Sequence, residues 1–230
     1  MKAIVLMSTF NGSKFVVEQV LSILDQLPPE GALMIRDDGS TDDTVARILS
    51  LRDPRIELSP GSNIGFGASF LTLLAHTPVD ADLVMFSDQD DVWLPGKIQR
   101  AWDQLRTFEN TPALYCSAQR LVDESLEVIG TSPRWPRGPS FTGAISENIV
   151  TGCTAGLNRS AVSLIARAGI PPEVRFHDWW MYLVVSAFGH VVVDEEPSLL
   201  YRQHGNNVIG RGAGWLGRHI QIVRFLARND

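Results

Sequence analysis

The first hundred residues alternate short apolar runs with stretches of helical periodicity, and this alternation constrains the fold more than any other feature. Runs rich in β-branched residues predict buried strands at Lys2–Met7, Ala32–Arg36, Arg55–Ser59 and Asp82–Ser87. Apolar spacing predicts helices over Lys14–Leu27, over Thr41–Leu51 and over a segment that ends near Ala75. Strands joined by helices pair in parallel, with helices on both faces. The sequence therefore predicts an α/β domain built on a parallel sheet.

Three polar clusters follow three of these strands, at Thr9–Gly12, Asp37–Ser40 and Asp88–Asp91. In parallel α/β sheets, ligands bind beyond the carboxyl ends of the strands, so we expect the three clusters to form one site. Ser40, with Asp43 three residues later, also resembles a capping box that begins the second helix.

The last cluster concentrates negative charge, because Asp88, Asp90 and Asp91 follow a buried strand within four positions. Such carboxylates repel one another and lose solvation unless a cation neutralises them. Mg²⁺ and Mn²⁺ take oxygen ligands and substrate phosphates, and the Asp-x-Asp spacing makes Asp90 the expected direct ligand. The alternative interpretation is a solvated acidic turn or a helix N-terminal cap.

Composition excludes several classes of protein. The formal net charge of −6 argues against nucleic acid as the main partner, since a basic surface would be expected for one. Cys116 and Cys153 lie far apart in the chain, so a disulfide framework or a zinc site is not expected and a reducing cytosol fits. The first apolar run is too short for a secretory signal, and no stretch of about 20 apolar residues predicts a membrane span. We therefore expect a cytoplasmic protein.

Four segments carry a resemblance to a known family: "STFNGSKFVVEQVLSILDQ", "IRDDGSTDDT", "NIGFGASF" and "FSDQDDVWLPGKI". In this order and spacing they resemble the nucleotide-sugar domain of the family 2 glycosyltransferases, which have the GT-A fold. The resemblance implies a nucleotide-sugar-binding half over residues 1–110, an acceptor-binding half over residues 111–210 and a basic amphipathic segment over residues 211–230.

The same resemblance implies roles for individual side chains. Nucleotide-binding roles fall on Thr9, Phe10, Asn11, Asp38 and Asp88. Asp38 would accept a hydrogen bond from a pyrimidine ring N–H, and Asp88 would lie near the ribose. Asp90 would bind Mn²⁺ or Mg²⁺ together with the donor diphosphate. Asp91 is either a second ligand or a helix-capping residue.

A second motif, "HDWW", precedes an apolar helix and resembles the form found in rhamnosyltransferase-like members of the family. An inverting transfer needs a carboxylate to take the proton of the acceptor hydroxyl, and Asp178 is the expected base. His177 would orient it or bind the acceptor. Trp179 and Trp180 would stack on a sugar or lie in the core. The alternative role for Asp178 is a favourable charge at a helix N-terminus.

Two further features lie near the end of the chain. In "LLYRQHGNN", His204 is a candidate third group at the metal and Arg202 a candidate phosphate ligand, although a lone histidine is often a satisfied surface or core residue. The segment 211–230 combines arginines with apolar residues. It predicts contact with the inner face of an anionic membrane or, alternatively, packing on the domain or in a dimer.

Together these features predict a metal-dependent, inverting glycosyltransferase. The donor would be a nucleoside diphosphate sugar, dTDP-rhamnose before a UDP-sugar, and the acceptor a glycan or lipid-linked hydroxyl. One alternative is a module that binds the nucleotide-sugar without turnover. Another is a haloacid-dehalogenase-like phosphatase, which needs a lysine downstream of its aspartates. Lys97, poorly placed for that role, is the only lysine after Asp91.

Overall fold

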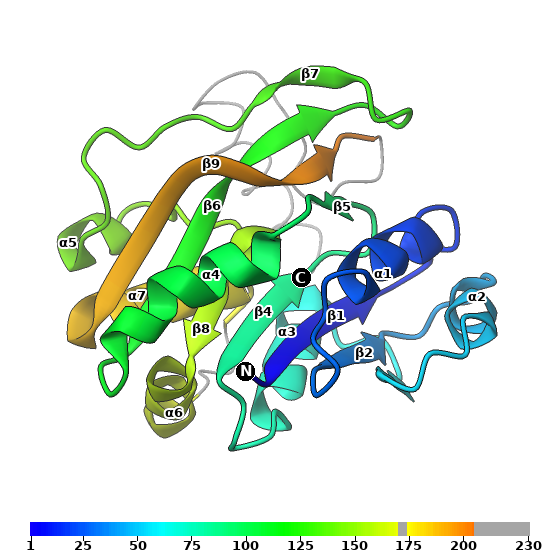
Figure 1. Cartoon of the computed structure of the whole chain (residues 1–230), viewed down its shortest axis with the longest axis horizontal. Coiled ribbons are helices and arrows are strands. Elements are labelled where there is room, and N and C mark those ends of the chain that lie inside the picture. Colours follow the sequence, from blue (N-terminus) through cyan, green and yellow to red (C-terminus); the bar gives the residue numbers. More distant parts are fainter. Residues whose placement is uncertain (170–173, 205–230) are drawn as a thin grey trace.

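The computed structural model describes residues 1–169 and 174–204, which form one mixed sheet covered by helices (Figure 1). The strands are β1 (Ala3–Thr9), β2 (Ala32–Asp37), β3 (Ile56–Pro60), β4 (Leu83–Ser87), β5 (Val92–Trp93), β6 (Ala113–Val122), β7 (Val128–Thr131), β8 (Gly156–Asn158) and β9 (His190–Arg202). The helices are α1 (Val16–Leu24), α2 (Thr44–Ser50), α3 (Phe66–Ala75), α4 (Lys97–Leu105), α5 (Phe141–Ala144), α6 (Arg159–Ala168) and α7 (His177–Phe188). The predicted amphipathic segment, 211–230, lies outside the described residues.

The first half confirms the predicted alternation. β3, β2, β1 and β4 are neighbours in this order and all pair in parallel. The predicted capping box is wrong, because α2 begins only at Thr44 and the Ser40 hydroxyl donates to Asp37, 2.5 Å away. Asp42 instead accepts a hydrogen bond from the Thr44 backbone N–H at 3.0 Å.

The second half adds antiparallel strand pairs to the parallel sheet predicted from the first half. β8 runs antiparallel between β4 and β6, so it joins the two halves into one continuous sheet. β9 is 13 residues long and pairs parallel with β6 and antiparallel with the short β5. The sequence did not indicate β8 and β5 because they are only three and two residues long, too short to give a periodic pattern.

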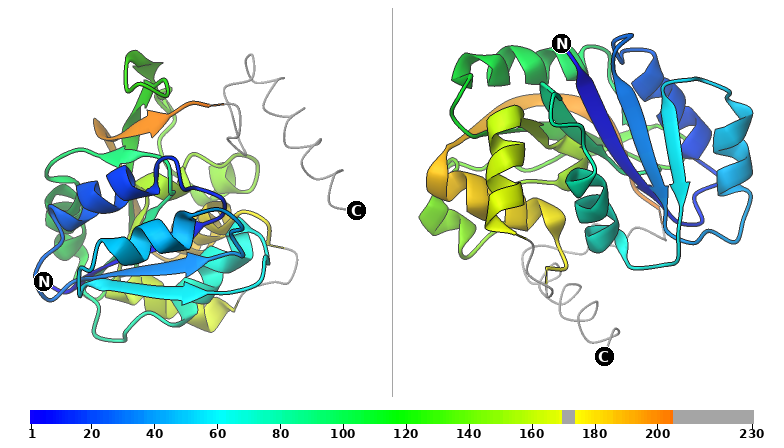
Figure 2. Two further views of the ribbon diagram at one scale, coloured as in Figure 1. Left: turned by 90° about the vertical axis from the view of Figure 1, so that its right-hand side faces the viewer. Right: turned by 90° about the horizontal axis from the view of Figure 1, so that it is seen from below.

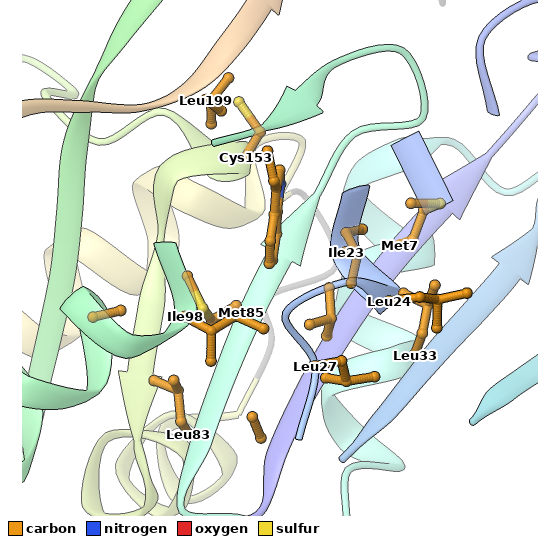
Figure 3. Packing of buried hydrophobic residues seen from close by; sticks show 14 of the residues in the cluster. Met7, Ile23, Leu24, Leu27, Leu33, Leu83, Met85, Ile98, Cys153 and Leu199 are labelled. Atoms are coloured by element: carbon orange, nitrogen blue, oxygen red, sulfur yellow. The ribbon is translucent and has the colours of Figure 1, made fainter. Parts of the chain in front are cut away.

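Each face of the sheet buries its own apolar cluster. Ala3, Val5 and Met7 of β1 pack with α1, α2 and α4, and Figure 3 shows part of this cluster around Met7 and Ile23. Ile4 and Leu6, on the opposite face of β1, pack with α3, α6 and α7. In the view from below in Figure 2, α4 lies on one side of the sheet and α6 and α7 on the other. Burial on both faces explains why β1 reads as a continuous apolar run.

β1, β2 and β4 end at the same edge of the sheet, and their last residues are Thr9, Asp37 and Ser87. The loops after these strands line one cavity together with the β6–β7 region and the start of α7. The three polar clusters of the sequence therefore meet as predicted. Among the described helices, none is long and apolar enough to cross a membrane.

Candidate active site

The acidic loop after β4 brings the predicted metal ligands together. Asp90 Oδ2 lies 2.7 Å from Nε2 of His204, although 114 residues separate the two in the chain. Asp88, Asp91 and the Cys153 thiol gather beside them, with one ligand atom of each within 4.8 Å of the others. Asp91 Oδ2 is buried and has no hydrogen-bond partner among the described residues. His204 thus lies beside Asp90 of the acidic loop.

Burial and mutual repulsion dominate the electrostatics of this loop. The pKa of Asp88 rises to about 7, chiefly through burial and then through the charges of Asp90 and Asp178. Burial, and then the charges of Asp90 and Asp88, raise the pKa of Asp91 well above its usual range. A cluster of this kind gains stability from a nearby positive charge.

One positive charge is already present, on a residue whose place in the site the sequence did not indicate. Lys97 of α4 is fully buried, and its Nζ donates to the carbonyl of Cys153 at 2.7 Å. The ammonium also lies 4.6 Å from the centre of the Trp93 ring. Burial lowers the pKa of Lys97 to about 8, whereas the charges of Asp91 and Asp88 act in the opposite direction.

The side chains at this position suit a divalent cation. Asp88 and Asp90 offer carboxylate oxygens towards the cavity, and His204 offers an imidazole nitrogen beside Asp90. Carboxylate oxygens are the ligands that Mg²⁺ and Mn²⁺ prefer, and Mn²⁺ also accepts imidazole. The buried Asp91 oxygen that no donor satisfies is a further sign that positive charge is lacking here. The residues therefore fit either ion.

Arg202 supports this loop rather than facing a ligand. Its side chain is 2% exposed and does not line the cavity. The guanidinium Nε donates to the Asp90 carbonyl at 2.8 Å, and its two terminal nitrogens donate to the Glu124 carbonyl at 2.6 Å and to Glu18 at 2.5 Å. The Arg202 backbone N–H donates to Asp91 at 3.1 Å. We therefore replace the predicted phosphate-binding role of Arg202 with one of holding Asp90 and Asp91 in place.

Of the residues predicted in the loop after β1, one is buried below the loop and two line the cavity. Thr9 is buried, and its hydroxyl donates to Asp37 at 2.9 Å, so it does not face a ligand. Phe10 is 45% exposed and lines the cavity. Asn11, also in the cavity wall, takes a left-handed φ of 48° and accepts a hydrogen bond from the Thr41 backbone N–H at 2.8 Å.

Asp38 lines the cavity, but its carboxylate already accepts several hydrogen bonds from the protein. Arg36 forms an ion pair with it, and the backbone N–H groups of Ile64 and Gly65 donate to it at 2.9 Å. These contacts fix the "NIGFG" turn beside the DDGS turn. The sequence had indicated both turns without showing that Asp38 joins them.

Asp178 is the first acidic residue of α7 and lies in the wall of the same cavity. Its two oxygens accept from the backbone N–H groups of Trp179 at 2.7 Å and Gly152 at 3.1 Å. Burial raises the pKa of Asp178 to about 6, although these hydrogen bonds favour the ionised form. Because the charge of Asp178 also raises the pKa of Asp88, the two carboxylates influence each other within the site.

The residues next to Asp178 have unequal environments. His177 is buried against Phe70, with ring centroids 4.2 Å apart, and burial lowers the pKa of His177 to about 3. Neither ring nitrogen has a hydrogen-bond partner among the described residues, so His177 is neutral.

Trp179 lines the cavity, and its indole N–H donates to the Ala144 carbonyl at 2.7 Å. Trp180 packs against the core and is outside the cavity wall, so the structure does not bring it to the site.

Comparison with known proteins agrees with this architecture. The sequence profile described as Glycosyl transferase family 2 matches residues 4–164. The chain is 28% identical over 236 residues to the dTDP-rhamnosyl transferase RfbG of Shigella flexneri, covering 94% of this chain and 78% of RfbG. It is also 24% identical over 224 residues to an uncharacterized glycosyltransferase of Haemophilus influenzae, covering 88% of this chain and 65% of that protein.

Two solved structures share the fold at low sequence identity. S. aureus TarS 1–349 in complex with UDP-GlcNAc superposes with a TM-score of 0.67 at 16% identity, over 90% of this chain and 60% of that one. The mannosyltransferase PcManGT of Pyrobaculum calidifontis, in complex with GDP-Man and Mn²⁺, gives 0.66 at 16% identity, over 97% of this chain and 64% of that one. This chain thus spans less than two thirds of either length. With its sheet, its acidic loop and the profile match over more than half its length, the chain belongs to glycosyltransferase family 2, has the GT-A fold and is a sugar-transferring enzyme.

Proposed function

We propose that the protein transfers a sugar from a nucleoside diphosphate donor to a hydroxyl acceptor, with inversion at the anomeric carbon and with Mn²⁺ or Mg²⁺ as cofactor. The observation that carries this proposal is the arrangement of two acidic groups in one cavity. The acidic loop with His204 lines the cavity, and the half-buried Asp178 carboxylate lines the same cavity. The acidic loop suits a cation and a diphosphate, and the Asp178 carboxylate suits a general base.

The reaction assigns a task to each group. Asp178, in its ionised form, takes the proton from the acceptor hydroxyl while that oxygen attacks the anomeric carbon. The bond from this carbon to the diphosphate breaks on the opposite side, and the nucleoside diphosphate leaves. Asp90 and His204, with Asp88 beside them, would hold the cation. When bound, the cation supplies positive charge against the developing charge of the departing diphosphate.

For the donor, we propose dTDP-rhamnose first and a UDP-sugar second. The likeness to RfbG, named a dTDP-rhamnosyl transferase, supports the first, and the structure of TarS with UDP-GlcNAc supports the second. Phe10, Asn11 and Asp38 would lie along the nucleotide, since all three line the cavity at the end of β1 and β2. Thr9 and Arg202 were also predicted to contact the donor; instead they would hold the cavity-lining loops in place through hydrogen bonds to Asp37 and Asp90.

For the acceptor, we propose a glycan or lipid-linked hydroxyl bound beside Asp178. Trp179 of α7 and Trp135, from the loop after β7, line the same cavity, and aromatic rings suit the apolar faces of sugars. His177 directly precedes Asp178 in α7, and burial lowers its pKa to about 3, which suits a neutral group that positions rather than titrates. Contact of residues 211–230 with the inner face of a membrane remains part of this proposal.

The experiment is calorimetric titration with dTDP, UDP and GDP, each with and without Mn²⁺. We expect one pyrimidine diphosphate to bind only with the ion, and Asp90→Asn to abolish that binding. Asp103→Asn, on the exposed face of α4, is the matched control. A protein that binds no nucleotide in the presence of Mn²⁺ would refute the proposed function.

Turnover separates an enzyme from a binding module. With dTDP-rhamnose and an acceptor, Asp178→Asn is expected to lose transfer while keeping nucleotide binding close to that of the unmodified protein. Loss of dTDP binding in this variant would place Asp178 on the donor side instead.

A further inference from the structure

The middle residue of the Asp-x-Asp sequence makes two hydrogen bonds that no motif predicts. Gln89 Oε1 accepts from the backbone N–H of Phe10 at 2.8 Å. Its Nε2 donates to the backbone carbonyl of the same residue at 3.0 Å. The side-chain amide therefore pairs with both polar groups of one peptide residue, as a neighbouring strand would, across 79 positions of sequence.

Gly12 leaves room for this amide. A Cβ built at Gly12 would lie 2.2 Å from Gln89 Oε1 and 2.4 Å from its Cδ, closer than atoms can approach. The backbone of Gly12 has no left-handed φ, so its conformation does not require glycine. Its N–H donates to the Thr44 hydroxyl at 2.8 Å, which holds the loop close to the amide. We call the Gln89 amide, the Phe10 backbone and the Cα of Gly12 the Gln89 clasp.

The clasp joins two surfaces of one ligand site. Gln89 lies directly between Asp88 and Asp90, so its position fixes the acidic loop. Phe10 and Gly12 belong to the first loop, and all three clasp residues line the cavity. Phe10 is 45% exposed, so few side-chain contacts anchor it, and its backbone position depends on hydrogen bonds such as these.

We propose that Gln89 is a positioning residue that sets the nucleotide end of the donor site relative to the cation and diphosphate end. This inference rests on the proposed function, because it assigns the two loops to two parts of one nucleoside diphosphate. A donor bridging both loops gains affinity only if their separation is held at the required value. The polar amide at the middle position is thus a structural requirement of this chain and not a spacer between two aspartates.

The test is a double-substitution cycle with Gln89→Ala and Gly12→Ala. The readout is the Kd for dTDP, or for whichever of dTDP, UDP and GDP the unmodified protein binds, in saturating Mn²⁺. Loss of two hydrogen bonds to an exposed loop is expected to weaken binding about tenfold in Gln89→Ala. Gly12→Ala is expected to weaken it at least as much, because the new methyl group displaces the amide.

The double variant distinguishes the clasp from two independent effects. Once the Gln89 side chain is removed, the methyl group at position 12 occupies vacated space. Adding Gly12→Ala to Gln89→Ala should therefore change the Kd by less than about twofold. In turnover, the KM for the donor should rise in Gln89→Ala more than kcat falls. Gln99→Ala, an exposed glutamine on α4, is the matched control, and the unfolding temperature of each variant shows that it is folded.

The outcomes separate this inference from the proposed function. If the unmodified protein binds dTDP with Mn²⁺ and folded Gln89→Ala binds it equally well, the clasp has no positioning role and this inference alone is wrong. Effects of Gln89→Ala and Gly12→Ala that add in the double variant would likewise overturn it. If the unmodified protein binds no nucleoside diphosphate, both the proposed function and the inference fail.

Discussion

The raised pKa of Asp178 predicts an acid limb in the pH dependence of sugar transfer. A general base works in its ionised form, and burial places the pKa of this carboxyl at about 6 instead of its usual value near 3.8. Activity is full above the pKa and is lost as the pH falls through it. The limb should therefore lie about two pH units higher than for an ordinary aspartate.

The magnitude follows from the titration curve of one group. With a pKa of about 6, roughly a tenth of the molecules carry an ionised Asp178 at pH 5, so kcat should be about tenfold below its plateau near pH 8. Substitution by asparagine should lower kcat by about 10²–10⁴-fold, the range for loss of a general base. The residual activity should be almost independent of pH, because asparagine does not titrate.

The assay measures kcat between pH 5 and 8.5 at saturating donor, acceptor and Mn²⁺. Saturation matters because the pKa of Asp88 is also raised, to about 7, and its titration would otherwise appear through donor and cation binding. Burial is the main cause of the Asp178 shift. A flat profile in this range, or an unchanged limb in Asp178→Asn, would refute the assignment of Asp178 as base.

Three further predictions concern the supporting structure. Arg202→Met should lower the free energy of unfolding by about 3 kcal/mol, because buried hydrogen bonds from a charged group are lost. Urea denaturation measures this change. A loss below about 1 kcal/mol would contradict the supporting role. Gly67→Ala should cost about 1–3 kcal/mol in the same assay, because the new Cβ would lie 2.4 Å from the Arg175 carbonyl oxygen. Cys116 and Cys153 are free and buried, and burial raises the pKa of both thiols. A thiol reagent should therefore modify both only after the protein unfolds. Rapid labelling of the native protein would contradict this prediction.

The sequence predicted the first half of the fold well because each element there has its own local signal. β1 is buried on both faces and carries an unbroken apolar run, and α1 presents a clear apolar stripe between two turns. The polar residues that end β1, β2 and β4 had to meet, since parallel strands share one carboxyl edge. The choice of Phe10, Asp38 and Asp88 within these clusters came from the resemblance to glycosyltransferase family 2, and all three line the cavity.

The second half was less predictable because its contacts are long-range. Nothing local in "LLYRQHGNN" shows that Arg202 is buried against Glu18, 184 positions away, while His204, two residues later, faces Asp90. A motif gives the residue type but not which of two neighbouring polar side chains faces the ligand. Trp179 and Trp180 present the same ambiguity, since successive helical residues point in different directions and only Trp179 reaches the cavity.

The pairing of β9 explains how these distant parts form one rigid site. The acidic loop leaves β4 at Ser87 and enters β5 at Val92, so it is held at both ends by the sheet. Val92 pairs with Leu200 of β9, which places Arg202 against the loop from behind and His204 against its open side. The carboxylates are thus held against one another by strand pairing and by Arg202, although their mutual repulsion would push a free loop apart. Under the proposed function, a site held in this way would bind a cation and a diphosphate with little reorganisation, which is the condition for strong electrostatic stabilisation of a departing anion. The acidic loop therefore needs Arg202 and His204 from the second half of the chain, although its Asp-x-Asp motif lies in the first half.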